Sequence, residues 1–294
     1  MTADEIMDEL VQELPGISDS ERATYFLARI KAIEDKDQRR ILENYFVIWL
    51  EYGSGALGKR RVVALIHGIR THARWFDLLE HILEEHANVE VCRIKYNYFD
   101  LFCFWFPLLF FRFFPQRRVT KALRRIRADY PSDTLVVVAH SFGTYLVSKV
   151  LKKNPDFRIQ RLLMSGAIVP EGYDWENLPN FPDEKPVNDC GTRDYLPVLA
   201  KTSTFGYGYS GTFGFNSHLI KNRFFDLGHS DFFREENLSE YWVPYILDGD
   251  IRGSTWGFER NDPPAWYSLI SRFQGQMLII FIVIFSSIIY GLHI

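Results

Sequence analysis

Residues Thr134–Gly143 read TLVVVAHSFG and carry the clearest indication of the fold class. The first six residues form an apolar run, which is typical of a strand buried on both faces of a parallel sheet. A helical pattern follows over Phe142–Lys153. Between strand and helix, Ser141 has a small residue two positions away on either side, Ala139 and Gly143. Because bulky residues at those positions would clash in a tight turn, the pattern predicts a strained strand-to-helix turn that carries a serine.

Strand and helix patterns alternate on both sides of this turn. The expected strands are Val62–Ile66, Val89–Lys95, Arg161–Ser165 and Arg223–Leu227, and the expected helices are Trp75–Glu85 and Gln116–Asp129. The alternation predicts an α/β domain with a mostly parallel central sheet over residues 59–272. Residues 1–58 carry two helical patterns and are expected to form an N-terminal helical segment, and residues 275–294 are expected to form a C-terminal hydrophobic helix.

Composition excludes several functional classes. With 47% hydrophobic and 24% charged residues among 294, the chain is neither disordered nor a multi-span membrane bundle. A net charge of -3 gives no reason to expect nucleic-acid binding. Three cysteines without a C-x-x-C spacing, and no H-E-x-x-H, disfavour a disulfide framework and a metal site, and no cofactor is expected. The stretch 53–60, GSGALGKR, has Arg60 where a phosphate-binding loop needs Ser or Thr, and it precedes a strand, so we reject it as a nucleotide site.

Three further features follow in a fixed order around the serine. His67-Gly68 follows the first strand, the loop 188–194 reads NDCGTRD, and Gly228-His229-Ser230 follows the last strand. Together with the turn at Ser141, residues 60–235 resemble the α/β-hydrolase superfamily, and within it the lipase- and esterase-like serine hydrolases. The order Ser141, Asp194, His229 is the order of that fold's catalytic residues.

The resemblance implies a role for each residue. Ser141 would attack an acyl carbonyl, His229 would take its proton, and Asp194 would hold the imidazole and stabilise its charged form. The backbone N–H of Phe142 and one from Gly68 or Ile69 would bind the oxyanion. The mechanism needs no metal.

The sequence offers more than one candidate for the acid and for the base. Asp189 lies five residues before Asp194, and Asp226 and Asp231 flank His229, so each is a candidate acid. His218 is a second histidine after the acid loop. His67 is expected to shape the oxyanion loop.

The aromatic content, 16%, is concentrated in one connection. Tyr96–Phe114 reads YNYFDLFCFWFPLLFFRFF and leaves the carboxyl end of a strand, so it should lie beside Ser141. We expect an interfacial segment over 98–114 that contacts a bilayer or an acyl chain, and the alternative is a buried lid or extra core. Seven cations follow it, and we expect them to attract an anionic membrane surface: Arg112, Arg117, Arg118, Lys121, Arg124, Arg125 and Arg127.

The C-terminal run Met277–Ile294, MLIIFIVIFSSIIYGLHI, contains no Asp, Glu, Lys or Arg. As a helix it would extend roughly 27 Å, close to the thickness of a bilayer's hydrocarbon core. We expect a single-pass tail anchor with the body in the cytosol, since the N-terminus has no signal-peptide pattern. The alternative is a core or oligomerisation helix.

These features predict a membrane-associated serine hydrolase that cleaves carboxylic esters, with membrane lipids or lipid-like acyl esters as its substrates. Two different functions stay open: a thioesterase acting on acylated membrane proteins through the same triad, and a catalytically inactive membrane scaffold whose N-terminal helices bind a partner. The headgroup, the acyl chain and the oligomeric state are not defined by the sequence.

Overall fold

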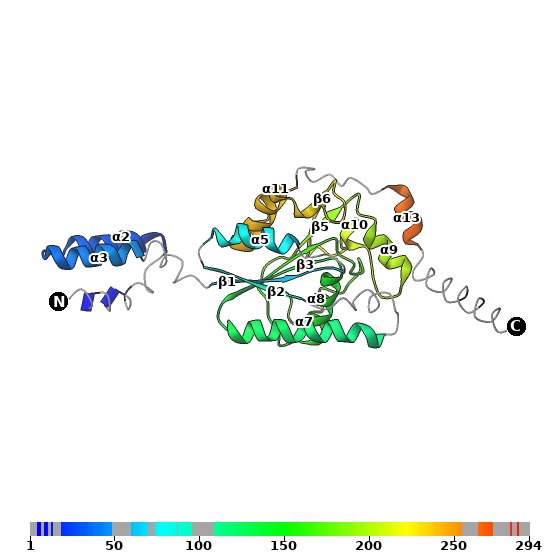
Figure 1. Cartoon of the computed structure of the whole chain (residues 1–294), viewed down its shortest axis with the longest axis horizontal. Helices are drawn as coiled ribbons and strands as arrows, with labels where there is room; N and C mark the ends of the chain where they lie inside the picture. Colours follow the sequence, from blue (N-terminus) through cyan, green and yellow to red (C-terminus); the bar gives the residue numbers. More distant parts are fainter. Residues whose placement is uncertain are drawn as a thin grey trace. The chain divides into compact units, whose positions relative to one another are not determined.

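The computed structural model describes residues 5–6, 9–10, 13, 19–48, 60–69, 74–86, 88–95, 109–254, 264–272, 283 and 287. The chain divides into two compact units, Met1–Arg60 with His86–Val89, and Arg61–Glu85 with Glu90–Ile294 (Figure 1).

Among the described residues of the first unit are the helices α2 (Asp19–Lys31) and α3 (Lys36–Ile48). The rings of Phe26 and Phe46 lie 5.1 Å apart and join the two helices. Both rings belong to a small apolar cluster that also contains Ile6, Leu10, Ile30 and Leu42. This unit therefore has a core of its own.

The second unit is built on a six-stranded sheet. Its strands are β1 (Arg61–Ile66), β2 (Val89–Ile94), β3 (Thr134–His140), β4 (Arg161–Ser165), β5 (Val187–Gly191) and β6 (Lys221–Phe225). The spatial order is β2-β1-β3-β4-β5-β6, and the pairs from β1 through β6 are parallel. The expected α/β fold with a mostly parallel sheet is therefore confirmed.

Register brings the carboxyl ends of these strands to one edge. Ile66 lies opposite Ala139, His140 opposite Ser165, and Ser165 opposite Asp189. The loops that leave β1, β3, β4 and β5 therefore begin side by side, which is where ligand sites form in parallel sheets.

Helices cover the two faces of the sheet. α7 (Leu109–Asp129) and α8 (Phe142–Lys153) lie on one face and α5 (Arg74–Glu84) on the other (Figure 1). On α7, Val119, Leu123 and Ile126 are buried in the main core. β3 is buried from Leu135 to its end, as a strand covered on both faces must be.

The remaining short helices follow the last two strands. They are α9 (Leu196–Ser203), α10 (Ser210–Phe213), η3 (Asp231–Phe233), α11 (Glu235–Asn237), η4 (Leu238–Trp242), α12 (Val243–Asp248) and α13 (Ala265–Ser271). α9 follows β5 and η3 follows β6, so both start near the carboxyl edge of the sheet.

Three expectations about element boundaries are wrong. α7 begins at Leu109 rather than Gln116, and it contains Pro115. The strand predicted at 223–227 lies at 221–225, and residues 188–191 of the predicted acid loop (188–194) belong to β5.

Arg112 does not have the exposed position that the row of cations predicts for it. Its side chain is buried, and the whole residue is 4% exposed. Its guanidinium donates hydrogen bonds to the Phe205 carbonyl (2.6 Å) and to the Thr204 hydroxyl (3.0 Å). It therefore fastens the first turns of α7 to the chain that leaves α9.

Most of the aromatic connection, residues 96–108, and all of 277–294 except two positions lie outside the described residues. Within the part of the chain that the structure describes, no helix is both long enough and apolar enough to span a bilayer.

Candidate active site

Ser141 occupies the predicted turn in a strained backbone conformation. Its φ of 53° and ψ of -120° lie outside the regions that non-glycine residues prefer, and its N–H donates to the Ser165 carbonyl at 3.0 Å. A Cβ added to Gly143 would lie 2.7 Å from the carbonyl oxygen of Ile66. The small residue after the serine is therefore required by the close approach of β1.

His229 and Asp194 come together from the loops after β6 and β5. The Nδ1 atom of the imidazole lies 2.7 Å from Oδ2 of Asp194. The other oxygen of that carboxylate accepts a hydrogen bond from the Leu196 N–H at 3.0 Å. Asp194 is almost fully buried, whereas the His229 side chain keeps 13% of its surface exposed. This arrangement holds the tautomer with a proton on Nδ1, which leaves Nε2 as an acceptor.

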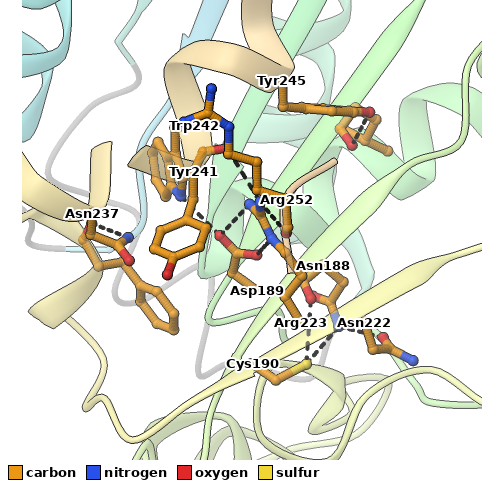
Figure 2. Close-up of polar contacts among 12 residues, drawn as sticks. Asn188, Asp189, Cys190, Asn222, Arg223, Asn237, Tyr241, Trp242, Tyr245 and Arg252 are labelled. Atoms are coloured by element: carbon orange, nitrogen blue, oxygen red, sulfur yellow. Dashed lines mark hydrogen bonds and ion pairs between the residues drawn. The ribbon is translucent and has the colours of Figure 1, made fainter. Parts of the chain in front are cut away.

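Asp189, the rival acid, has a different environment (Figure 2). Its carboxylate accepts two hydrogen bonds from Arg223, at 2.6 and 3.0 Å, and one from the Trp242 indole at 2.9 Å. Both side chains of the ion pair are fully buried. Arg223 also donates to the carbonyls of Tyr241 and Arg252, at 3.2 and 3.4 Å. Asp189 therefore links β5, β6 and η4 as a structural ion pair.

Asp226, Asp231 and His218 are engaged away from the pair formed by His229 and Asp194. Asp226 pairs with Arg193 at 3.1 Å, and Asp231 accepts hydrogen bonds from the Gly228 N–H and from Arg234. The His218 side chain is 81% exposed. Among the described residues, the carboxylate that the structure brings to His229 is Asp194.

Two glycines show how closely the groups of this site approach one another. A Cβ on Gly68 would lie 2.7 Å from the Cβ and 3.1 Å from the Oγ of Ser141. A Cβ on Gly166, whose φ is +52°, would lie 2.9 Å from the His229 ring and 3.1 Å from the His140 ring. The absence of a side chain at Gly68 and Gly166 therefore leaves the space that the side chains of Ser141, His140 and His229 occupy.

The candidate oxyanion donors lie on both sides of the serine. Gly68 lies where an added Cβ would meet the Ser141 side chain, and Ile69 follows it in the loop after β1. Phe142 is the first residue of α8, where backbone N–H groups point out of the helix. Its ring is buried and stacks on Tyr145.

His140 is a neighbour that the sequence did not identify as part of the site. Its ring centroid lies 4.4 Å from that of His229, and its Nδ1 lies 3.1 Å from the Ser165 hydroxyl. Burial, and then the nearby His229, lower the pKa of His140 well below its ordinary value. His140 is therefore neutral at neutral pH and adds no positive charge beside the base.

His67 lies in the loop before Gly68. Its Nδ1 lies 2.6 Å from the Gly68 carbonyl oxygen, which fits the expected role of shaping this loop. Burial lowers the pKa of His67 as well. The imidazoles of His67 and His140 thus both favour the neutral form beside the candidate triad.

Besides His140, Ser165 and Gly166 are residues of this site that the sequence does not identify. A pattern in the sequence could have indicated them, because a Ser-Gly pair stands at the carboxyl end of β4, the strand next to β3 in the sheet.

No group of three His, Cys, Asp or Glu side chains within the described ranges is arranged to hold a metal ion.

Comparison with known proteins gives similarity at the level of solved structures. No protein-family model matches the chain, and no curated protein sequence matches it. The chain is similar to an extracellular α/β-hydrolase from a Paenibacillus species, with 20% identity and a TM-score of 0.27 over 37% of this chain and 41% of that one. The chain thus spans about two fifths of that protein's length.

Two other solved structures are similar over more of their length. One is an α/β-superfamily hydrolase, described as putative, from Xanthomonas campestris, with 17% identity and a TM-score of 0.37 over 62% of this chain and 97% of that one. The other is an acetyl xylan esterase, with 10% identity and a TM-score of 0.35 over 64% of this chain and 95% of that one.

Proposed function

We propose that this chain is a membrane-associated serine hydrolase of the α/β-hydrolase type that cleaves carboxylic esters of lipid or lipid-like acyl groups. The observation that carries the proposal is the 2.7 Å hydrogen bond between His229 and Asp194, on the same sheet edge as the strained Ser141.

In the proposed reaction, the Ser141 oxygen attacks the acyl carbonyl carbon and its proton passes to Nε2 of His229. Asp194 accepts the hydrogen bond from Nδ1–H and stabilises the imidazolium. The tetrahedral intermediate collapses, the ester C–O bond breaks, and the leaving alcohol takes the proton from His229. A water molecule then attacks the acyl-serine by the same route and releases the carboxylic acid.

The oxyanion of each intermediate would be bound by backbone N–H groups. Phe142 supplies one from the start of α8, and Gly68 or Ile69 supplies the other from the loop after β1. The closeness of Gly68 to the Ser141 hydroxyl supports this assignment, because a side chain at position 68 would occupy the space beside the reacting oxygen.

The lipid substrate class rests on the sequence around the site. The aromatic connection 96–114 follows β2 in the sequence, and the uncharged run 277–294 has the length of a single bilayer span. An ester substrate held in a membrane would therefore be presented to the site by the membrane itself.

Lipid profiling tests the reaction. Membrane extracts are incubated with the full chain or with the Ser141→Ala variant, and lipids are quantified by mass spectrometry. We expect a defined set of acyl lipids to fall, with free fatty acid rising, in the sample with unaltered protein only. Identical profiles would contradict the proposed substrate class.

Fractionation tests the anchor. Deleting residues 277–294 should move the protein from the carbonate-washed membrane fraction to the supernatant. If the shortened chain stays with membranes as completely as the full chain does, the anchor is wrong.

A further inference from the structure

An apolar surface begins one residue after the candidate acid. Asp194 is buried, but the side chains that follow it along α9 are exposed: Tyr195 is 49% exposed, and Leu196 and Leu199 are each 39% exposed. The Leu196 N–H donates to Oδ1 of Asp194, so the surface is joined directly to the site. Phe205, just beyond α9, is 45% exposed.

α13 extends this surface. It lies beside α9 (Figure 1), and Tyr267 holds it there by donating a hydrogen bond to the Arg193 carbonyl at 3.1 Å. Tyr267 is buried, whereas Trp266 and Leu269 on the same helix are 52% and 57% exposed. Monomeric proteins seldom leave large apolar side chains grouped in this way unless the group binds something.

The start of α7 adjoins the same region. Arg112 bonds to the Phe205 carbonyl, and the next two residues, Phe113 and Phe114, are 45% and 47% exposed. Exposed cations follow within the next turns of the helix: Arg117, Arg118, Lys121 and Arg125. Aromatic side chains bordered by cations have the chemistry of the headgroup layer of an anionic bilayer.

The direction of the chain also indicates a bilayer. α13 ends at Ser271, Arg272 is exposed, and the uncharged run begins five residues later at Met277. If that run enters a bilayer, the short connection keeps α13 near the membrane surface. A surface rich in Trp, Tyr, Phe and Leu beside this exit would then contact lipid.

We infer that Tyr195, Leu196, Leu199, Phe205, Trp266 and Leu269 form a docking surface that lies on an anionic phospholipid bilayer and holds the Ser141 edge of the sheet against it. This inference rests on the proposed function and deepens it, because it states how the site meets its substrate. The row of cations on α7 attracts anionic lipid headgroups, whereas a two-fold contact through this surface would bring two rows of like charge to one interface, so the row favours lipid over a second copy of the chain.

Photocrosslinking in the full chain tests this surface. The photoreactive residue p-benzoylphenylalanine replaces Leu199 or Leu269, and the protein is reconstituted into vesicles of phosphatidylcholine and phosphatidylglycerol. The matched control carries the same residue at Glu236, an exposed position on α11 of the same unit. After irradiation, mass spectrometry counts adducts with lipid and with protein.

We expect lipid adducts at positions 199 and 269 to exceed those at position 236 about ten-fold, since an interfacial side chain is surrounded by acyl chains. Equal adducts at all three positions would overturn the inference. Adducts with a second protein chain at 199 and 269 in place of lipid would overturn it in favour of self-association.

Labelling of Ser141 by a fluorophosphonate in the same vesicles separates this inference from the proposed function. Ser141 labelling without lipid adducts removes the docking surface and leaves the hydrolase. Lipid adducts without Ser141 labelling leave the surface and remove the hydrolase.

Discussion

Asp189 and Asp194 lie five residues apart, yet their carboxylates have opposite kinds of partner. Asp194 has a histidine with an exposed edge, and Asp189 has a fully buried arginine and an indole. A carboxylate that must orient a base needs the first environment, and a carboxylate that holds strands together needs the second. The two residues should therefore fail in different ways when substituted.

We expect Asp194→Asn to lower the rate of ester cleavage by about 10⁴-fold, because the amide holds the wrong imidazole tautomer, with little change in stability. Asp189→Asn should instead lower the free energy of unfolding by about 3–5 kcal/mol, because it leaves the Arg223 charge buried without its partner. Urea unfolding and hydrolysis of a soluble ester measure the two effects. Loss of activity by Asp189→Asn in a fully stable protein would reverse the assignment.

Gly166 gives a second prediction at this scale. Its φ is +52°, and a Cβ there would lie 2.9 Å from the His229 ring, so Gly166→Ala should push the base out of position. We expect about a 10²-fold loss of kcat/KM, since a displacement near 1 Å has this cost. The matched control is Gly172→Ala, where an added Cβ meets nothing within 4 Å. Equal activity of the two variants would contradict the placement of His229.

His140 predicts how stability depends on pH. Its pKa is lowered well below the ordinary 6.5, first by burial and then by His229. As the pH falls through about 6.5, the unfolded chain binds a proton at this residue and the folded chain does not. The free energy of unfolding should therefore fall with decreasing pH, by up to about 1.4 kcal/mol per pH unit from this group.

Urea unfolding between pH 5 and pH 8 tests the effect of His140 by comparison with His140→Gln. The variant should lose less stability than the unaltered chain as the pH falls, because it lacks the buried imidazole whose pKa is lowered in the folded state. Parallel pH profiles would mean that His140 takes up its proton as readily in the folded state as in the unfolded chain.

The strands that the sequence predicts correctly are those with a run of apolar residues. β1, β3 and β4 read as apolar runs and were found within one residue of their bounds. β5 was missed because its sequence, VNDCG, is polar although all five residues are buried. The Asn188 side-chain NH2 donates to the Ser210 carbonyl and to the Asn222 side chain, and Asp189 pairs with Arg223. Those partners are distant in sequence, so no local pattern reveals them.

In the candidate site too, the features that depend on local sequence could be predicted, and those that depend on distant partners could not. The serine turn and the order of acid and base were readable because they depend on local spacing, as in Ala139-His140-Ser141-Phe142-Gly143. The choice between Asp189 and Asp194, and the contact of His140 with His229, depend on how β5 and β6 lie beside each other. The early start of α7 was missed because Pro115 is expected near the first turn of a helix rather than in its seventh position.

Arg112 gives a prediction for α7. Its buried guanidinium bonds to the Phe205 carbonyl and the Thr204 hydroxyl and lies 4.2 Å from the centre of the Tyr207 ring. Arg112→Lys keeps the charge but loses the planar stacking and part of the hydrogen bonding, so it should lower the free energy of unfolding by about 1–3 kcal/mol. Arg118→Lys on the exposed side of the same helix should change it by less than about 0.5 kcal/mol. Equal effects would place Arg112 on the surface.

In the unit that contains the sheet, the candidate triad and the exposed apolar side chains of α9 lie near the same edge of the sheet. The parallel sheet delivers Ser141, Asp194 and His229 to one edge from three different strands. The helix that follows the acid, α9, exposes apolar side chains beside that edge, and α13 leads from the same region toward the uncharged C-terminal run. A single orientation would therefore bring both the candidate nucleophile and the apolar surface to a membrane.

Ser141 is the nucleophile of the proposed reaction, activated by His229 and Asp194, and covalent labelling detects a serine of this kind. The full chain is treated with a fluorophosphonate probe and the adduct is located by peptide mass spectrometry. We expect one adduct, on the peptide that contains Ser141; it should be absent from Ser141→Ala and form far more slowly in Asp194→Asn. No adduct on the unaltered chain, or an adduct that persists in Ser141→Ala, would contradict it.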